Sequence, residues 1–348
     1  MRILVLDPRR GDDKSDLFVV NAANGEWQRI RLGYVPEIHF NRAANEIAVV
    51  DTDLGGKLWR KRDRYLLKRF AADTLKPIRT HETPIRPMYT GYPGRSAHLD
   101  SSPSGRYLFV LETGGVLRDP VADSGFRLTA SRYDCELDRF EQGKFAVDSC
   151  SVAFGHMGTG DQDLYFHLSC DYPSTIAFGS FGSSSVDFLA MEPLEQRVHN
   201  IRESCGSWLD RETGTLYCVT GAGAIYQVGR QPPACLQLIQ LPLEGSQSVP
   251  LQQIYGGGGY LFVGVSNPAE RGVSVATQVW QVSIAGRKLA GVIDLPFPAM
   301  NFVTTEDGRT LVGTSPFTRA VFVIDTTTKS LLQRINIGMR PAEVQLLP

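Results

Sequence analysis

An all-β fold, and within that class a seven-bladed β-propeller, is predicted by three features of the sequence. Short β-rich segments alternate with turns of Gly, Asp, Asn and Ser along all 348 residues, as in proteins built from hairpins. No window of a dozen residues carries the apolar stripe of an amphipathic helix, whose period is about 3.6 residues. The strand pattern recurs at intervals of about 50 residues, and four strands in a repeat of this length are typical of a propeller blade.

One strongly apolar strand marks each of the seven repeats. Its β-branched and aromatic residues favour strand structure. Tight turns precede other strands of the repeats, for example at Thr213 and Gly214 and at Asp307 and Gly308, where the residue types suit hairpins. The seven apolar segments are residues 17–20, 65–67, 126–129, 175–178, 224–228, 279–282 and 320–325.

The two ends of the chain are expected to meet in one sheet. The last repeat, residues 320–348, has the length of only three strands, and residues 2–7 form an apolar strand at the other end. This N-terminal strand can join the C-terminal blade and close the ring, which leaves no long sheet edge exposed. We therefore predict a single propeller domain over residues 1–348, without an internal linker.

Composition excludes several classes of function. The 36 Lys and Arg residues against 37 Asp and Glu residues leave a net charge of −1, which provides no overall attraction to nucleic acid or to an anionic membrane. No apolar stretch approaches the ~18 residues of a membrane helix. The apolar N-terminal segment is too short for the hydrophobic region of a signal peptide, and it is interrupted by an acidic residue at Asp7. We expect a cytoplasmic chain as written, and a periplasmic one if the N-terminus has been trimmed, with neither nucleic acid nor membrane as a partner.

Candidate ligand-binding residues come from the predicted inner strands. The first strand of each propeller blade lines the central channel, and the seven inner segments are residues 36–39, 94–98, 147–150, 202–205, 250–253, 299–302 and 341–344. Imidazole and carboxylate groups there could bind a cation or a polar substrate, although a merely wet channel is polar too. The candidates from these segments are Glu37, His39, Arg95, His98, Asn301 and Glu343.

Motifs for catalysis or metal binding are absent from the sequence. It contains no C-x-x-C, H-E-x-x-H or G-x-S-x-G motif, so we predict no metal site and assign no catalytic residue. Ser96, His98 and Asp100 lie at alternate positions of one strand. Such residues share a face of the strand without forming a proton relay.

The order of several motifs resembles one propeller family, the heavy subunit of the amine dehydrogenases that use tryptophan tryptophylquinone, such as methylamine dehydrogenase. The resemblance implies a chain without a cofactor of its own. In that family a small light chain carries the quinone, the substrate is a primary amine, and heavy and light chains form a heterotetramer. The similar segments are residues 6–10, 33–36, 63–77, 91–93, 102–109, 150–170, 176–178 and 321–326.

The same resemblance implies roles for single residues. Tyr34 matches the aromatic wall of the family's substrate channel, and Cys150 and Cys170 match its heavy-chain disulfide. The chain departs from the family at its N-terminus, which lacks the long arm that embraces the light chain. It also has Gly94 where the family has a tryptophan after Tyr-Pro.

Three hypotheses for the function follow. The first is a heavy-chain-like subunit, as a homodimer or in a heterotetramer, that shapes the channel of a partner-borne quinone site. The second is an independent enzyme, such as a lactonase-like hydrolase or a lyase, whose channel residues supply a cation site or acid and base groups. The third is a non-catalytic binding or scaffold propeller. Only the first requires a quinone-bearing partner, and only the second predicts activity from the chain alone.

Overall fold

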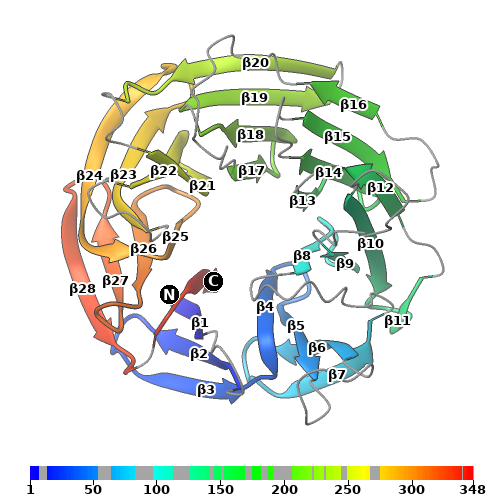
Figure 1. The fold of residues 1–348 in the computed structure, drawn as a ribbon. Coiled ribbons are helices and arrows are strands. Elements are labelled where there is room, and N and C mark those ends of the chain that lie inside the picture. Colours follow the sequence, from blue (N-terminus) through cyan, green and yellow to red (C-terminus); the bar gives the residue numbers. More distant parts are fainter. Residues whose placement is uncertain are drawn as a thin grey trace, which may run out of the picture.

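The computed structural model of the protein describes residues 1–7, 14–53, 64–83, 97–112, 126–141, 145–149, 153–168, 175–181, 187–190, 206–221, 223–230, 233–243, 249–266, 275–338 and 340–347. These residues form an all-β propeller, in which the sheets follow one another around a central axis (Figure 1). Six sheets are each built from one continuous stretch of chain. A further sheet, sheet A, joins the N-terminal strands to the C-terminal strand.

The strands of sheet A, from the axis outward, are β29 (Glu343–Leu347), β1 (Arg2–Asp7), β2 (Asp16–Asn21) and β3 (Trp27–Arg31). Sheet B contains β4 (Tyr34–Asn41), β5 (Glu46–Asp53), β6 (Arg64–Ala71) and β7 (Pro77–Glu82). Sheet C contains β8 (Ala97–Ser101), β9 (Tyr107–Glu112) and β10 (Phe126–Asp134), and both β11 (Arg139–Phe140) and β12 (Phe145–Ser149) pair with β10. Sheet D contains β13 (Ala153–Met157), β14 (Asp163–Leu168), β15 (Thr175–Ser180) and β16 (Asp187–Ala190).

Three sheets complete the ring. Sheet E contains β17 (Gly206–Asp210), β18 (Thr215–Val219), β19 (Ala224–Arg230) and β20 (Pro233–Gln240). Sheet F contains β21 (Val249–Gly257), β22 (Tyr260–Ser266), β23 (Ala276–Ser283) and β24 (Lys288–Ala299). Sheet G contains β25 (Asn301–Thr304), β26 (Thr310–Ser315), β27 (Ala320–Asp325) and β28 (Ser330–Asn336).

Each apolar segment that the sequence marked lies in the third strand of a different sheet, in β2, β6, β10, β15, β19, β23 and β27. The third strand is covered on both faces by the neighbouring sheets, so it can be apolar at every position rather than at alternate ones. In β27, for example, five successive residues from Ala320 are buried. This double burial explains why the repeat is visible in the sequence.

Neighbouring sheets are held together by apolar side chains that point alternately to either side of a strand. In β1, Ile3 lies in a cluster with Val321 of sheet G, whereas its neighbour Leu4 lies in a cluster with Ile47 of sheet B. All four side chains are fully buried. Successive residues of a strand face opposite ways, and a fully buried aliphatic side chain contributes about 1.5 to 3 kcal/mol. The core therefore lies between the sheets and leaves the axis to polar residues.

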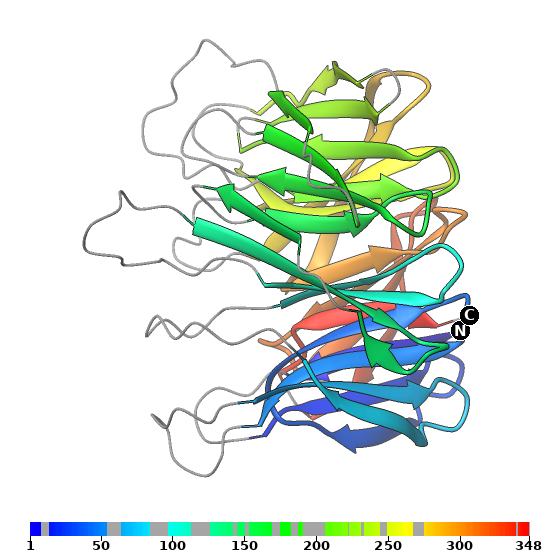
Figure 2. The ribbon, with the colours of Figure 1, turned by 90° about the vertical axis from the view of Figure 1, so that its right-hand side faces the viewer.

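The two chain ends close the ring, as predicted, but the division of strands is different from the prediction. β1 pairs antiparallel with β29, from Arg2 opposite Leu347 to Leu6 opposite Glu343, and the two termini lie together at one face of the ring (Figure 2). The expectation of three C-terminal strands and one N-terminal strand is wrong. Residues 320–336 complete sheet G, and sheet A takes three strands from the N-terminus and one from the C-terminus. The error arose because the repeat was started at the apolar third strand instead of the inner strand.

Candidate functional site

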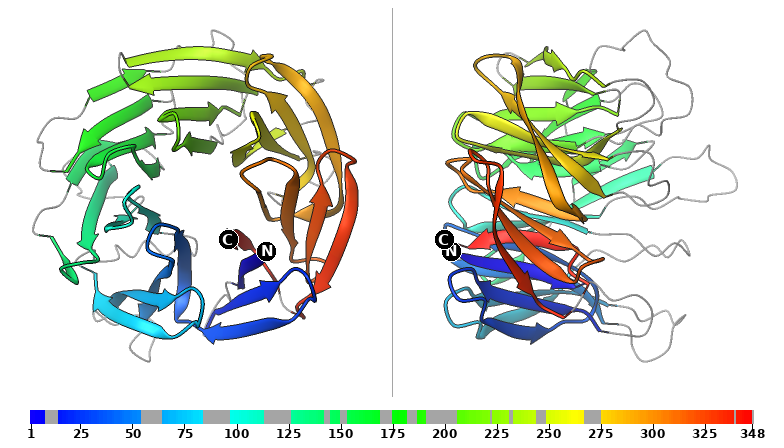
Figure 3. Two further views of the ribbon diagram at one scale, coloured as in Figure 1. Left: turned by 180° about the vertical axis from the view of Figure 1, so that it is seen from behind. Right: turned by 90° about the vertical axis from the view of Figure 1, so that its left-hand side faces the viewer.

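Five of the predicted inner segments overlap strands next to the axis, namely β4, β8, β21, β25 and β29 (Figure 3). The prediction for residues 147–150 is wrong, because Val147 belongs to β12, which pairs with β10 away from the axis. The inner strand of the next sheet is β13 instead. The extra strands β11 and β12 lengthen this repeat, so the next inner strand begins later in the sequence than the regular spacing predicts. Residues 202–205 lie outside the described residues.

Several candidates cannot be placed as side chains. Arg95, Cys150 and Cys170 lie outside the described residues. Tyr34 and His98 are placed by their backbone alone: Tyr34 is the first residue of β4, and His98 is in β8 opposite Leu111 of β9. The remaining candidates, Glu37, His39, Asn301 and Glu343, fall into two polar groups.

The first group is centred on two carboxylates from neighbouring sheets. Glu37 lies on β4 of sheet B and Glu343 on β29 of sheet A, and both side chains are partly buried. Burial, with the nearby charge of Glu37, raises the pKa of Glu343 from its ordinary value of 4.5 to about 8. An acid is expected to hold its proton when ionisation would place two negative charges in one poorly solvated place. At neutral pH the pair therefore keeps one proton.

The amide of Gln345 sets the two carboxylates at the same level. The backbone N–H of Phe40 donates to Gln345 Oε1 at 2.8 Å, and Gln345 Nε2 donates to the carbonyl oxygen of Ile38 at 2.7 Å. Gln345 thus lies beside residue 39 of β4. Strands rise by the same distance per residue, and side chains two positions apart point to the same face. The residues two positions before residue 39 and before Gln345 therefore lie beside each other as well. Those residues are Glu37 and Glu343.

Tyr255 and Asn301 extend this group to sheets F and G. The Tyr255 hydroxyl donates to Asn301 Oδ1 at 3.2 Å. Burial raises the pKa of Tyr255 to about 12, and the charge of Glu343 acts in the same direction. Thr314 Oγ1 donates to the carbonyl oxygens of both Asn301 and Ala342, at 3.2 and 3.1 Å, and so ties β25 to the residue that precedes Glu343. Inner strands of four consecutive sheets, F, G, A and B, therefore contribute polar groups to one region of the channel.

A buried acceptor lies beside these residues. Gln253 Nε2 donates to the carbonyl oxygen of Met300, the residue before Asn301, at 2.5 Å. Gln253 Oε1 is buried and has no hydrogen-bond partner among the described residues. Leaving a buried acceptor unpaired costs about 1 to 3 kcal/mol. A donor placed beside this oxygen would remove that cost.

The second group contains His39 and ties sheets B to E together. His39 Nε2 lies 2.9 Å from Ser101 Oγ and 3.6 Å from Asp100 Oδ1. Asp100 also pairs with Arg211, the residue after β17, and its Oδ2 accepts the backbone N–H of Met157 at 2.8 Å. Burial lowers the pKa of His39 to about 4, an effect that Asp100 opposes and Arg211 assists. His39 is therefore neutral at physiological pH.

This Ser–His–Asp arrangement does not form a catalytic relay. In such a relay serine and aspartate bind opposite nitrogens of the imidazole, whereas Ser101 and Asp100 both lie against Nε2 of His39. A base with a pKa near 4 also draws a serine proton poorly at neutral pH. The group supports the architecture of the inner strands instead of chemistry.

Tyr255, Gln253 and Gln345 belong to the first polar group but were not among the predicted candidates. The predicted inner segment ended at residue 253, but the register of β21 shifts between Pro250 and Ile254, and this irregularity extends the inner strand to Gly257. A longer window would have included Tyr255. The pairing of Gln345 with β4 depends on ring closure and has no local signal.

Two further features are absent from the described residues. In the described part of the chain, no group of three or more His, Cys, Asp or Glu side chains could coordinate a metal ion. The same residues include no helix of the length and apolarity that crossing a membrane requires.

Comparison with known proteins supports the propeller fold without a specific family. No family model and no curated protein matches the sequence. Similar solved structures include the β-propeller domain of Myceliophteria thermophila Cps50 (Swd1), with a TM-score of 0.58 and 9% identity over 87% of this chain and 86% of that one. Apo AztD from Citrobacter koseri has a TM-score of 0.52 and 11% identity over 99% and 96%. The dihydro-heme d1 dehydrogenase NirN has a TM-score of 0.53 and 12% identity over 99% and 74%. The chain is a β-propeller protein with distant structural neighbours.

Proposed function

We propose that this propeller binds a small cation of the primary ammonium class in its central channel, between Glu37 and Glu343. The observation that carries the proposal is the position of these two carboxylates, at one level on the adjacent inner strands β4 and β29. A cation placed between them would replace the proton that the pair keeps, because it offsets the second negative charge.

The neighbouring groups favour a ligand that donates hydrogen bonds. The carboxylates are acceptors, and Gln253 Oε1 is a buried acceptor without a partner among the described residues. A primary ammonium group has three N–H donors, as lysine has. A quaternary ammonium ion has none. The channel chemistry thus supports primary amines over fully substituted ones.

The sequence resemblance favours a more specific role, that of an amine dehydrogenase heavy-chain-like subunit. Tyr34, the residue that matches the family's aromatic channel wall, begins the same inner strand that carries Glu37. In this role the chain would bind and orient a primary amine beside a small partner light chain, within a heterotetramer. Tryptophan tryptophylquinone on that light chain would supply the oxidation. The two candidate functions share the amine and differ in the need for a partner.

Binding of the amine is tested by calorimetric titration of the purified chain with methylammonium and with tetramethylammonium. We expect methylammonium to bind at least about tenfold more tightly, the value of one charge-assisted hydrogen bond. Glu37→Gln and Glu343→Gln should each weaken methylammonium binding by a similar factor. The control is Glu212→Gln, in the exposed turn after β17, which should bind as the wild type does. Equal affinity in all four proteins would refute the proposal.

The heavy-chain role is tested by isolating the protein at its natural abundance from its native host. A small co-purifying chain with the visible absorption of a quinone would support it. A colourless propeller without such a chain would contradict the subunit role and leave amine binding as a separate question.

A further inference from the structure

We infer that closure of the propeller ring is sensitive to protons: a proton held on Glu343, beside Glu37, keeps the C-terminal strand β29 docked, and loss of that proton loosens the strand. This inference concerns the folded chain without any ligand. It therefore stands or falls independently of amine binding.

The closing strand has few attachments for a strand that completes a ring. β29 pairs with β1 alone and forms the inner edge of sheet A. Beyond that ladder, Ala342 N–H donates to the carbonyl oxygen of Leu6 at 2.9 Å, and the Ala342 carbonyl oxygen accepts from Thr314 Oγ1 at 3.1 Å. The Gln345 amide binds β4. Val344 and Leu347 supply its buried apolar side chains. Terminal strands open at lower free-energy cost than central ones.

One of these few attachments carries a like-charge contact. Glu343, the first residue of β29, lies on the inner strand next to the one that carries Glu37, near enough for the charge of Glu37 to raise its pKa. The other groups around it are the Tyr255 hydroxyl of β21 and the neutral Asn301 side chain of β25, while Leu6 lies opposite it on β1. Among the described residues, no lysine or arginine offsets the charge of Glu343. Ionising both acids therefore opposes docking.

The direction of the pH effect follows from proton uptake. Burial and the charge of Glu37 hold the pKa of Glu343 at about 8 when the strand is docked, against 4.5 for an ordinary glutamate. Between these two values the docked strand binds a proton that the undocked strand does not. The strand is consequently docked most firmly below pH 4.5, and docking weakens as the pH rises from 4.5 through about 8. Between these two pKa values the docking equilibrium constant falls by up to about tenfold per pH unit.

Hydrogen exchange measured by mass spectrometry can test this directly. Protection of the β29 amides is compared with protection of the β27 amides in the same sample, after correction for the intrinsic pH dependence of exchange, from pH 5.5 to 8.5. In the wild type we expect the β29 to β27 ratio to fall by up to about tenfold per pH unit. In Glu343→Gln, which cannot ionise, the ratio should stay constant.

Further variants separate a proton effect from simple weakening of the strand. Gln345→Ala removes the two bonds to β4, so it should lower β29 protection at every pH and keep the wild-type slope. Glu37→Gln removes one cause of the raised pKa of Glu343, so the fall should level off at a lower pH and be smaller in total. If Glu343→Gln does not fold, Glu37→Gln still tests whether the pH dependence comes from Glu343. A wild-type ratio that is flat with pH, or an unchanged slope in Glu343→Gln, would overturn the inference.

Discussion

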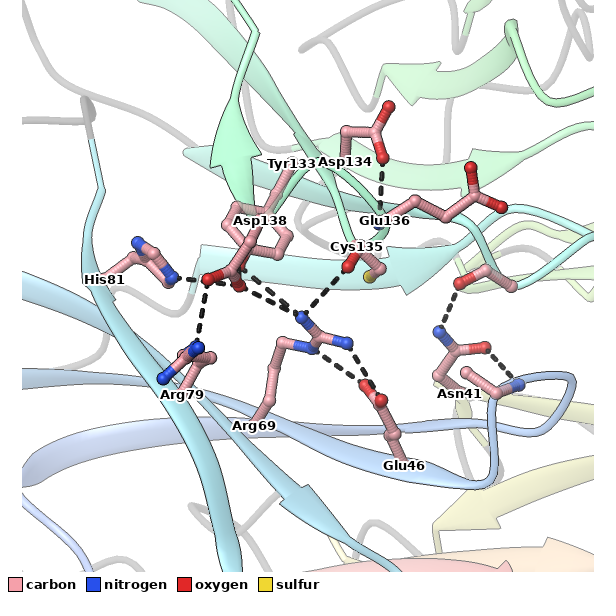
Figure 4. A network of polar contacts seen from close by, with 12 residues as sticks. Asn41, Glu46, Arg69, Arg79, His81, Tyr133, Asp134, Cys135, Glu136 and Asp138 are labelled. Atoms are coloured by element: carbon pink, nitrogen blue, oxygen red, sulfur yellow. Dashed lines mark hydrogen bonds and ion pairs between the residues drawn. The ribbon is translucent and has the colours of Figure 1, made fainter.

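Arg69 and Glu46 form a bidentate ion pair on adjacent strands of sheet B, with both N–O distances at 2.8 Å (Figure 4). The same guanidinium lies 3.5 Å from the Tyr133 hydroxyl and from Asp138 Oδ1, both of the next sheet. Asp138 accepts in addition from Tyr133 at 2.5 Å. The Arg69 side chain is only 7% exposed. The guanidinium also donates to the carbonyl oxygen of Cys135 at 3.4 Å, so one buried cation connects Glu46 of sheet B to three residues of the next blade.

Replacing this cation should destabilise the ring strongly. Arg69→Met keeps much of the packing volume but leaves Glu46 as a poorly solvated carboxylate, and breaking a buried pair from one side costs about 3 to 5 kcal/mol. The measurement is the free energy of unfolding in urea. Arg79→Met is the matched control, because Arg79 also pairs with Asp138, at 3.0 Å, but its side chain is 64% exposed. An exposed pair contributes about 0 to 1 kcal/mol. Equal losses in the two variants would contradict the role of burial.

Tyr34→Ala tests the residue that the family resemblance singles out. If Tyr34 forms part of the wall that selects amines, its removal should change the order of preference among primary amines of different size, because a missing ring admits bulkier groups. In that case stability should change little, because a ring in the channel wall would add little to the core between the sheets. Affinities for methylammonium and benzylammonium, with the melting temperature as a control, would measure both effects. An unchanged preference would remove Tyr34 from the site.

Amine affinity should increase with pH. The proposed ligand needs the ionised acid pair, and the proton held at Glu343, whose pKa is about 8, competes with it. An alkylammonium ion keeps its charge to a pH of about 10, as lysine does. We therefore expect the dissociation constant of methylammonium to fall by up to about tenfold per unit between pH 6 and pH 8. Titration in buffers of different ionisation enthalpy should show release of one proton. Affinity that is constant over this range would count against competition at Glu343.

The parts of the fold that sequence could predict are those with a local physical signal. Doubly covered strands such as Ala320–Asp325 are apolar at every position, so the repeat and the fold class were visible. Glu37 and Glu343 could be assigned to inner strands because those strands recur at a regular spacing. Their proximity was not predictable, because it depends on pairing between Leu6 and Glu343 at opposite ends of the chain. The position of Val147 was mispredicted, because β12 adds to the outer part of sheet C.

The surroundings of His39 could not be predicted for a different reason. His39 was expected to serve a ligand, and strand alternation does place it on the face of β4 that carries Glu37. Its imidazole is instead engaged by Ser101 of sheet C, 2.9 Å away. A hydrogen bond between neighbouring sheets depends on tertiary packing and leaves no pattern in either strand.

His39 gives the protein a pH response opposite in sign to that of Glu343. Burial lowers the pKa of His39 from 6.5 to about 4, so between these values the unfolded chain binds a proton that the folded chain excludes. The contribution of neutral His39 to folding stability is therefore fully present above pH 6.5. It is lost as the pH falls toward 4, at up to about 1 kcal/mol per pH unit.

We expect His39→Gln, which can still bond to Ser101, to lose less stability than the wild type between pH 6.5 and pH 4.5 in urea unfolding experiments. His81→Gln is the matched control, because His81 lies in a partly exposed contact with Asp138. If His39→Gln and the wild type lose the same stability over this range, burial does not keep His39 from binding a proton. The bond to Ser101 would then not weaken the fold at low pH.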